Sequence, residues 1–195
     1  MRYFIISQPK SGTYLCGNLL SELGIVNSLL HYKKTGYISF KDVPLEEAKM
    51  NNTGKKVRAS YPDVLSDIPE ESFALSHLQY NAENVKYLKD FKKVLVKRDL
   101  SSALSSFNDF VAETNRTLEY FDMRQLYNGV KGWENEHNTF IITFDDMINK
   151  NIEKIDQLQE FLFGEIKHDS EQAITQALAK DSVTKSNKRK NSENF

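Results

Sequence analysis

The chain has 195 residues, of which 39% are hydrophobic and 27% are charged, and this length and composition predict one domain, residues 1–195, with a well-buried core. Lysine plus arginine (26) nearly balances aspartate plus glutamate (27), so the net charge of −1 argues against nucleic acid or a membrane surface as a partner. No apolar run reaches the length of a transmembrane helix, and the first predicted strand begins too close to Met1 for a signal peptide, so we expect a cytoplasmic protein.

Four apolar or β-branched runs have the length of buried strands, and helical patterns separate most of them. The runs are residues 3–6, 73–76, 94–96 and 139–144. Strands that alternate with helices predict an α/β fold, with three α/β/α layers around a central parallel sheet. Ligands bind such folds at the edge where the carboxyl ends of the strands meet.

Apolar residues with helical spacing follow three of these runs. After the first run, Leu15, Leu19 and Leu23 recur every four residues and place Cys16 in a core-facing helix. Comparable faces are formed by Leu100, Leu104, Phe107 and Val111, and by Ile148, Ile152, Ile155 and Leu162. Cys16 is therefore predicted to be a core thiol rather than a nucleophile.

Two segments have no sustained period. Residues 28–71 mix aromatic residues with glycine, proline and lysine, and we expect an irregular insert such as a lid over a binding site. Residues 181–195 are polar and basic and are predicted to be a tail, or a loop that orders on a ligand.

The stretch PKSGT, residues 9–13, joins the first predicted strand to the first helix. Such a junction offers backbone N–H groups and the positive end of a helix dipole, so it can bind an anion, usually a phosphate. Gly12 lets the backbone close on the anion, Ser11 and Thr13 add hydroxyl donors, and Lys10 adds a point charge. The stretch is not the ATP-binding P-loop, because its lysine precedes the glycine. An ordinary turn with a solvated lysine is the alternative.

Two other polar residues follow predicted strands. Arg98 is suited to bidentate phosphate binding, and Ser106, eight residues later, lies about two helical turns further on. The alternative is that Arg98 is a surface charge paired with Asp99 or a nearby acid. His77 is placed for general-base work, although a lone histidine is more often structural; His31, His137 and His168 have no comparable setting.

In combination, these stretches resemble the sulfotransferases that use 3′-phosphoadenosine 5′-phosphosulfate (PAPS). The sequence reads PKSGTYL, SHLQY and RDLSSALSS where the family has motifs close to PKSGTTW, THLP and RDPRDVALS. A further stretch, FIITFDDM, resembles a family strand that ends in Tyr-Glu-Asp. The resemblance spans residues 3–163 and implies the P-loop-NTPase-like sulfotransferase fold.

The resemblance also implies an activity: transfer of a sulfuryl group from PAPS to a hydroxyl or amine of a small-molecule or glycan acceptor. Adenosine 3′,5′-bisphosphate (PAP) is the product, no metal is required, and residues 28–71 become a possible acceptor-binding lid. Lys10, His77 and Ser106 take the catalytic positions: Lys10 stabilises the leaving phosphate, and His77 accepts the acceptor proton. The implied donor-binding residues are Lys10, Ser11, Gly12, Thr13, Tyr14, Arg98, Ser106, Phe144, Arg189 and Lys190.

The sequence departs from the family pattern in three places that concern the donor. Leu15 stands for a common tryptophan, and Phe144 stands for a tyrosine that often contacts adenine. The terminal RKGxxGxWK motif is reduced to Lys188, Arg189 and Lys190. Two other functions stay open: a nucleotide-binding, kinase-like enzyme with a similar phosphate turn, and a non-catalytic module that binds a nucleotide or a protein partner.

Overall fold

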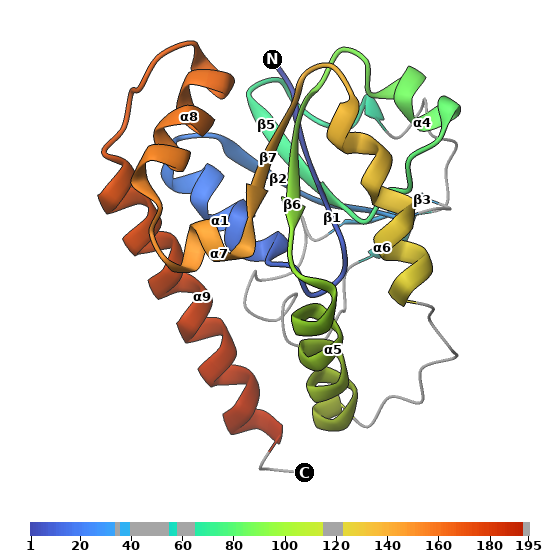
Figure 1. Cartoon of the computed structure of the whole chain (residues 1–195), viewed down its shortest axis with the longest axis vertical. Helices are drawn as coiled ribbons and strands as arrows, with labels where there is room; N and C mark the ends of the chain where they lie inside the picture. The colour runs from blue at the N-terminus through green and yellow to red at the C-terminus, as the bar shows by residue number, and fades with distance from the viewer. Residues whose placement is uncertain (34–35, 40–54, 58–64, 115–122, 193–195) are drawn as a thin grey trace.

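The computed structural model describes residues 1–33, 36–39, 55–57, 65–114 and 123–192. Within these residues one seven-stranded sheet has the order β4-β3-β2-β5-β1-β6-β7 (Figure 1). The strands are β1 (Tyr3–Ser7), β2 (Val26–Lys33), β3 (Gly36–Ser39), β4 (Lys55–Val57), β5 (Ser72–Ser76), β6 (Lys92–Lys97) and β7 (Thr139–Thr143). The strands from β2 to β7 in this order are parallel, and β3 and β4 continue the sheet in antiparallel pairing.

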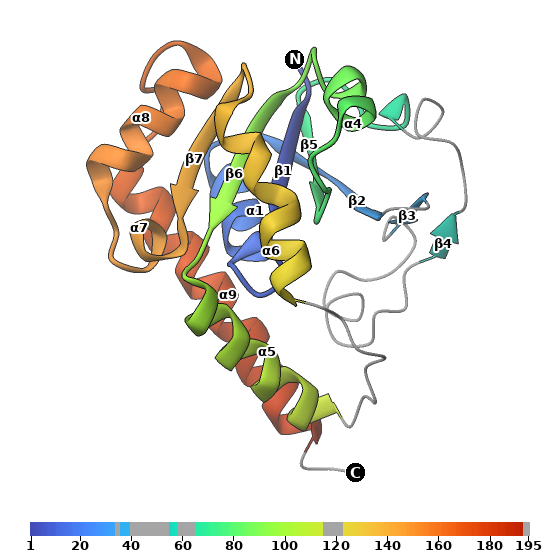
Figure 2. The same ribbon diagram turned by 45° about the vertical axis from the view of Figure 1, so that its right-hand side comes forward.

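Helices cover both faces of the sheet. They are α1 (Thr13–Glu22), α4 (Ala82–Tyr87), α5 (Leu100–Thr114), α6 (Met123–Lys131), the 3₁₀ helix η1 (Gly132–Asn135), α7 (Phe144–Ile148), α8 (Ile152–Phe163) and α9 (Ser170–Ser192). Figure 2 shows α6 in front of the strands and α1 and α9 behind them. The predicted three-layer α/β/α fold is confirmed, and all four predicted strands are present.

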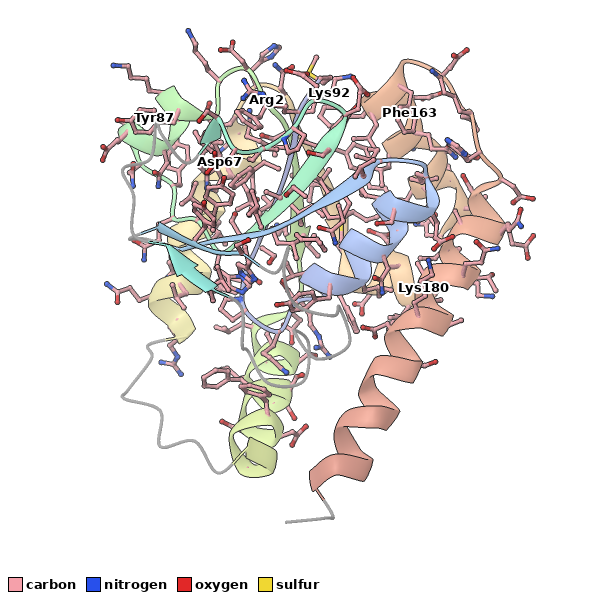
Figure 3. All side chains as sticks on the ribbon, turned by 180° about the vertical axis from the view of Figure 1, so that it is seen from behind. Arg2, Asp67, Tyr87, Lys92, Phe163 and Lys180 are labelled. Carbon is pink, nitrogen blue, oxygen red and sulfur yellow. The ribbon has the colours of Figure 1, made fainter. Side chains whose placement is uncertain are left out.

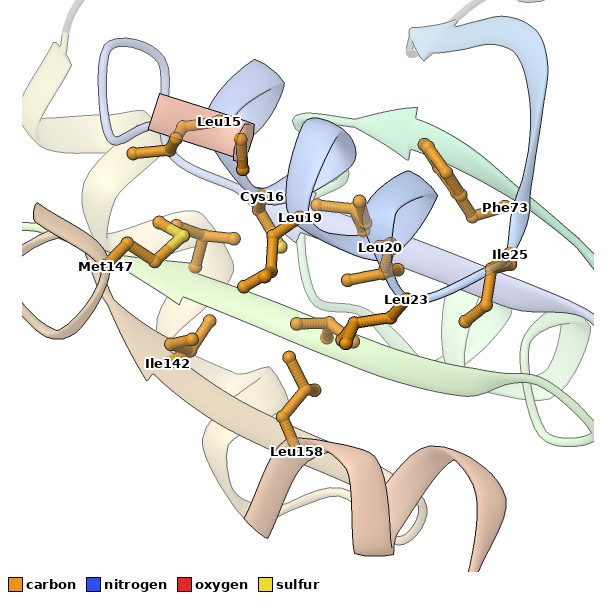
Figure 4. Close-up of a cluster of buried hydrophobic side chains, with 14 of the residues drawn as sticks. Leu15, Cys16, Leu19, Leu20, Leu23, Ile25, Phe73, Ile142, Met147 and Leu158 are labelled. Atoms are coloured by element: carbon orange, nitrogen blue, oxygen red, sulfur yellow. The ribbon is translucent and has the colours of Figure 1, made fainter. Parts of the chain in front are cut away.

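A buried apolar cluster fills each of the two gaps between layers. On one face, Leu15, Leu19 and Leu23 extend from α1 toward the sheet and meet residues of α7, α8 and α9 (Figure 4). Cys16 belongs to this cluster and is fully buried, as predicted, and burial strongly raises the pKa of its thiol. On the other face, Trp133 packs on the sheet and donates a hydrogen bond from Nε1 to the carbonyl of Leu78 at 3.0 Å.

The prediction of an irregular insert over residues 28–71 is wrong for residues 28–33, 36–39 and 55–57, which form strands. Residues 28–33 belong to β2, and β3 and β4 lie further along the segment. The pairing of β2 with β5 shifts in register between Asn27 and His31, and Leu29 between them has a left-handed φ of 59°. This bulge interrupts the alternation of side chains that marks a strand, so the sequence pattern does not predict β2. Residues 40–54 and 58–64 lie outside the described residues.

The predicted polar tail is helical through Ser192, because α9 continues over residues 181–192. The stretch from Ser170 to Ser192 contains no glycine or proline that would end a helix. Its first half is held on α1 by Ala173, Ile174 and Ala177. Lys180, which Figure 3 labels on α9, adds an ion pair with Glu22 of α1. Among the described residues, no helix is long and apolar enough to span a membrane.

The predicted helical face from Ile148 to Leu162 is divided between two helices. Helix α7 ends at Ile148, and α8 begins at Ile152 after a turn that contains Lys150 in a left-handed conformation, with φ of 51°. Ile155 and Leu162 are buried as expected, whereas Ile148 is 42% exposed. The turn rotates α8 relative to α7, so the shared face does not continue across it.

Candidate functional site

The candidate site lies at the carboxyl edge of the sheet, the lower edge in Figure 1. Strands β5, β1 and β6 are parallel neighbours. His77 and Arg98 follow β5 and β6 directly, and Lys10 lies in the turn after β1, so the topology brings all three residues to the same edge.

The turn between β1 and α1 depends on two residues with left-handed backbone. Lys10 has φ of 65° and Gly12 has φ of 93°. A Cβ atom added at Gly12 would lie 2.7 Å from Cδ2 of Phe144, closer than real Cβ contacts allow. The position therefore requires glycine both for its φ and for the close approach of the Phe144 ring.

The amino end of α1 has the electrostatic character of an anion site. The N-cap residue Gly12 supplies no side-chain hydrogen bond, and the first turn of α1 contains no acidic residue. The first N–H groups of a helix have no intrahelical acceptor, and the helix dipole adds positive potential there. A phosphate oxygen would satisfy these donors.

The hydroxyl groups predicted to bind the anion instead support the turn. Ser11 donates from Oγ to the carbonyl of Gln8 at 2.6 Å, and Oγ1 of Thr13 lies 2.5 Å from Oγ of Ser7. Ser7, Ser11 and Thr13 are all buried. Their hydrogen bonds fix the shape of the turn, which leaves the backbone N–H groups as its main anion donors.

Arg98 is tied to this turn. Its Nη1 donates to the carbonyl of Lys10 at 2.9 Å, and its guanidinium carbon lies 4.1 Å from the centroid of the Phe144 ring. Its Nε is buried with no hydrogen-bond partner among the described residues. An unsatisfied buried donor is costly, and an anion oxygen would remove that cost.

Asp99 does not pair with Arg98, so that part of the alternative from the sequence is wrong. The Asp99 carboxylate accepts hydrogen bonds from Oγ of Ser101 and, at 2.9 Å, from the backbone N–H of Ser102, at the start of α5. These bonds lower the pKa of Asp99. The guanidinium of Arg98 is left directed at the turn and at Phe144.

Ser106 lies on the face of α5 that is turned toward Lys10. The Lys10 ammonium lies 4.4 Å from the centroid of the Phe110 ring. Ser106 and Phe110 are four residues apart in α5 and therefore share a face. Helix geometry thus places the half-buried Ser106 hydroxyl on the same side as Lys10 and Arg98.

The hydrogen bonds of His77 define its tautomer. Nδ1 lies 2.9 Å from the carbonyl oxygen of Ser7, and Oγ of Ser7 is 3.2 Å from the same nitrogen. A carbonyl oxygen can only accept, so Nδ1 carries the hydrogen and Nε2 is the basic nitrogen of the neutral ring. In this tautomer the lone pair that accepts a proton lies on Nε2.

A second histidine, which the sequence pattern does not predict, lies beside His77. His31, on β2, is buried, and its ring centroid lies 5.0 Å from that of His77. The Tyr14 hydroxyl lies 3.3 Å from Nδ1 of His31, so this predicted donor-binding residue contacts the histidine pair. The missed signal is strand order: β2 pairs with β5, whose end carries His77.

Four residues that the sequence motifs relate to the donor site lie on α7, α1 and α9. Phe144 begins α7, where Thr143 and Asp146 form a capping box, and its ring contacts Arg98 and Gly12. Leu15 is 1% exposed in the core and does not line the site. Arg189 and Lys190 belong to α9, which extends past the carboxyl edge (Figure 1), and their side chains are not described. Within the described residues, no group of three or more metal-ligating side chains occurs.

The chain belongs to the sulfotransferase domain family, which matches residues 1–195. The fold is similar to the crystal structure of mouse sulfotransferase SULT7A1 complexed with PAP, with a TM-score of 0.56 and 20% identity over 91% of this chain. It is also similar to retinol dehydratase in complex with androsterone and inactive cofactor PAP, with a TM-score of 0.52 and 14% identity over 90% of this chain.

The chain spans less than two thirds of the length of either solved structure: 64% of the sulfotransferase and 62% of the dehydratase. No curated protein matches the sequence. The match of the family model to residues 1–195 confirms the family that the sequence motifs indicated.

Proposed function

We propose that this protein transfers a sulfuryl group from PAPS to a hydroxyl or amine of a small-molecule or glycan acceptor, at the carboxyl edge of the sheet. The observation that carries the proposal is the hydrogen bond from Arg98 to the carbonyl of Lys10. This bond joins two sets of anion donors, the amino end of α1 and the guanidinium, into one site. A nucleotide with phosphates at two positions can use both sets at once.

The donor is bound by residues of three elements in this proposal. The turn of residues 11–13 holds the 5′-phosphate through backbone N–H groups, and Arg98 with Ser106 holds the 3′-phosphate. Tyr14, Arg189 and Lys190 are also assigned to donor binding in this proposal, as the family resemblance implies. The role of Phe144 changes, because its ring already packs on Arg98 and Gly12. We assign it to holding these two residues in place rather than to stacking on adenine.

Two side chains carry the chemistry. PAPS supplies the sulfuryl group, and PAP is the product. His77 accepts the acceptor proton on Nε2, while its Nδ1–H stays bonded to Ser7. Lys10 stabilises the negative charge that develops on the leaving phosphate oxygen. These residues act by positioning and charge neutralisation, so the proposal needs no metal.

The test is transfer from sulfur-labelled PAPS to a panel of phenols, alcohols, amines and sugars, with PAP release measured in parallel. We expect label in at least one acceptor and a matching amount of PAP. PAP binding without transfer to any acceptor, or to water, would favour the non-catalytic module. The family match argues against the kinase-like alternative, and tight binding of ATP with Mg²⁺ but not of PAP would restore it. A cytoplasmic location stays a prediction, which fractionation of the native protein would test.

A further inference from the structure

His31 occupies a place beside His77 that the sheet itself determines. Strand β2 pairs with β5 in parallel, and His31 is opposite Leu75, two residues before His77. The two rings meet edge to face, with centroids 5.0 Å apart and planes inclined by 64°. His31 is only 6% exposed, so its ring is held by the protein around it.

The contacts of His31 connect His77 to the amino end of α1. The Tyr14 hydroxyl lies 3.3 Å from Nδ1 of His31, and the rings of these two residues also meet edge to face, 6.1 Å apart. On its other side, His77 is bonded to Ser7, whose Oγ lies 2.5 Å from Oγ1 of Thr13. These two routes of contact to His77 therefore end on the first two residues of α1.

The orientation of a histidine ring depends on contacts of this kind. The torsion that rotates an imidazole about its Cβ–Cγ bond is broad and roughly two-fold, so it does not select one orientation by itself. A ring flip would exchange the position of Nδ1 with that of a carbon and break the bond to Ser7. The His31 ring lies beside the His77 ring, where a packed neighbour would oppose this rotation.

We infer that His31 is a positioning residue for His77: its ring keeps the His77 imidazole in the orientation in which Nδ1–H bonds to Ser7 and Nε2 is the basic nitrogen. The geometric part of this inference stands alone, and its catalytic consequence rests on the proposed function. Ring shape provides the support, so phenylalanine should replace His31 and alanine should not.

Nitrogen NMR of protein labelled at histidine tests the inference without donor or acceptor, because the shifts of the two ring nitrogens report which one carries hydrogen. We expect the Nδ1–H tautomer for His77 in the native protein, and only a small shift in His31→Phe, because that variant keeps a ring at this position but loses the contact with the Tyr14 hydroxyl. In His31→Ala the shifts should move toward the average of the two tautomers. Tyr14→Phe, at a 44% exposed position, removes only the hydroxyl contact and should cause a smaller shift in the same direction.

Unchanged His77 shifts in folded His31→Ala would overturn the inference, and Tyr14→Phe decides alone if the alanine variant does not fold. Turnover gives the second readout: His31→Ala should lose on the order of 10²-fold per folded molecule with PAP affinity unchanged, whereas His31→Phe should stay close to native. Equal turnover in the two variants would limit His31 to a structural role. A native protein without transfer activity would contradict the proposed function, while the NMR result would still decide the role of His31.

Discussion

Replacing Gly12 with alanine tests the phosphate turn, and Gly164→Ala is a matched control. Both glycines have left-handed backbone, with φ of 93° and 81°. A Cβ at Gly164 meets nothing within 4 Å, whereas a Cβ at Gly12 lies 2.7 Å from the Phe144 ring. Left-handed backbone costs a non-glycine residue about 1–2 kcal/mol, and forcing an atom into a packed site costs about 1–3 kcal/mol more. We expect a loss of about 1–2 kcal/mol for the control and about 2–5 kcal/mol for Gly12→Ala.

Denaturant unfolding measures these losses, and calorimetry with PAP measures their effect on the site. Gly164→Ala should bind PAP like the native protein. Gly12→Ala should bind it more weakly, because relief of the contact moves Phe144 and, with it, Arg98. Equal losses of unfolding free energy in the two variants would refute the close approach to Phe144. Native PAP affinity in folded Gly12→Ala would refute the placement of the phosphate at this turn.

Three further variants test the catalytic roles of His77 and Lys10 and the capping box of Thr143 and Asp146 at the start of α7. His77→Ala should keep donor affinity and lose about 10²–10⁴-fold in turnover, together with the acid limb of the rate profile; near-native turnover would remove His77 from the mechanism. Lys10→Ala should lose about 10²–10³-fold in turnover and also weaken donor binding, and a pure binding defect would contradict its assigned role. Partial burial raises the pKa of Asp146, but hydrogen bonds from Thr143 and Asn151 outweigh it and leave the pKa below its usual 3.8. A carboxyl group with a lowered pKa stabilises the folded protein above pH 3.8, and this stabilisation is lost as the pH falls through the pKa of the folded state. Asp146→Asn should therefore make the free energy of unfolding less dependent on pH in this acid range. An unchanged pH dependence of unfolding would contradict this.

The parallel strands and the edge they define could be predicted from the sequence. Buried parallel strands are continuous apolar runs, and β1, β5 and β6 follow this pattern. Because right-handed crossovers bring the carboxyl ends of such strands together, the positions of Lys10, His77 and Arg98 followed from the pattern alone.

The contacts that refine the site could not be predicted, since they join residues far apart in the chain. The bulge at Leu29 concealed β2, and with it the approach of His31 to His77. The contact of Phe144 with Gly12 depends on where α7 begins relative to α1, which no local pattern encodes. The helical continuation of α9 was missed because its second half is polar and basic, the composition that also marks a tail.

The most direct test of the central claim is the affinity of the native protein for PAP compared with AMP, measured by calorimetry. PAP can use both the turn of residues 11–13 and Arg98, whereas AMP has only the 5′-phosphate. We predict that PAP binds at least about 10-fold more tightly, since hydrogen bonds to charged groups contribute about 1.5–3 kcal/mol, and that Arg98→Ala abolishes the difference. Equal affinities for PAP and AMP in the native protein would contradict the two-phosphate site.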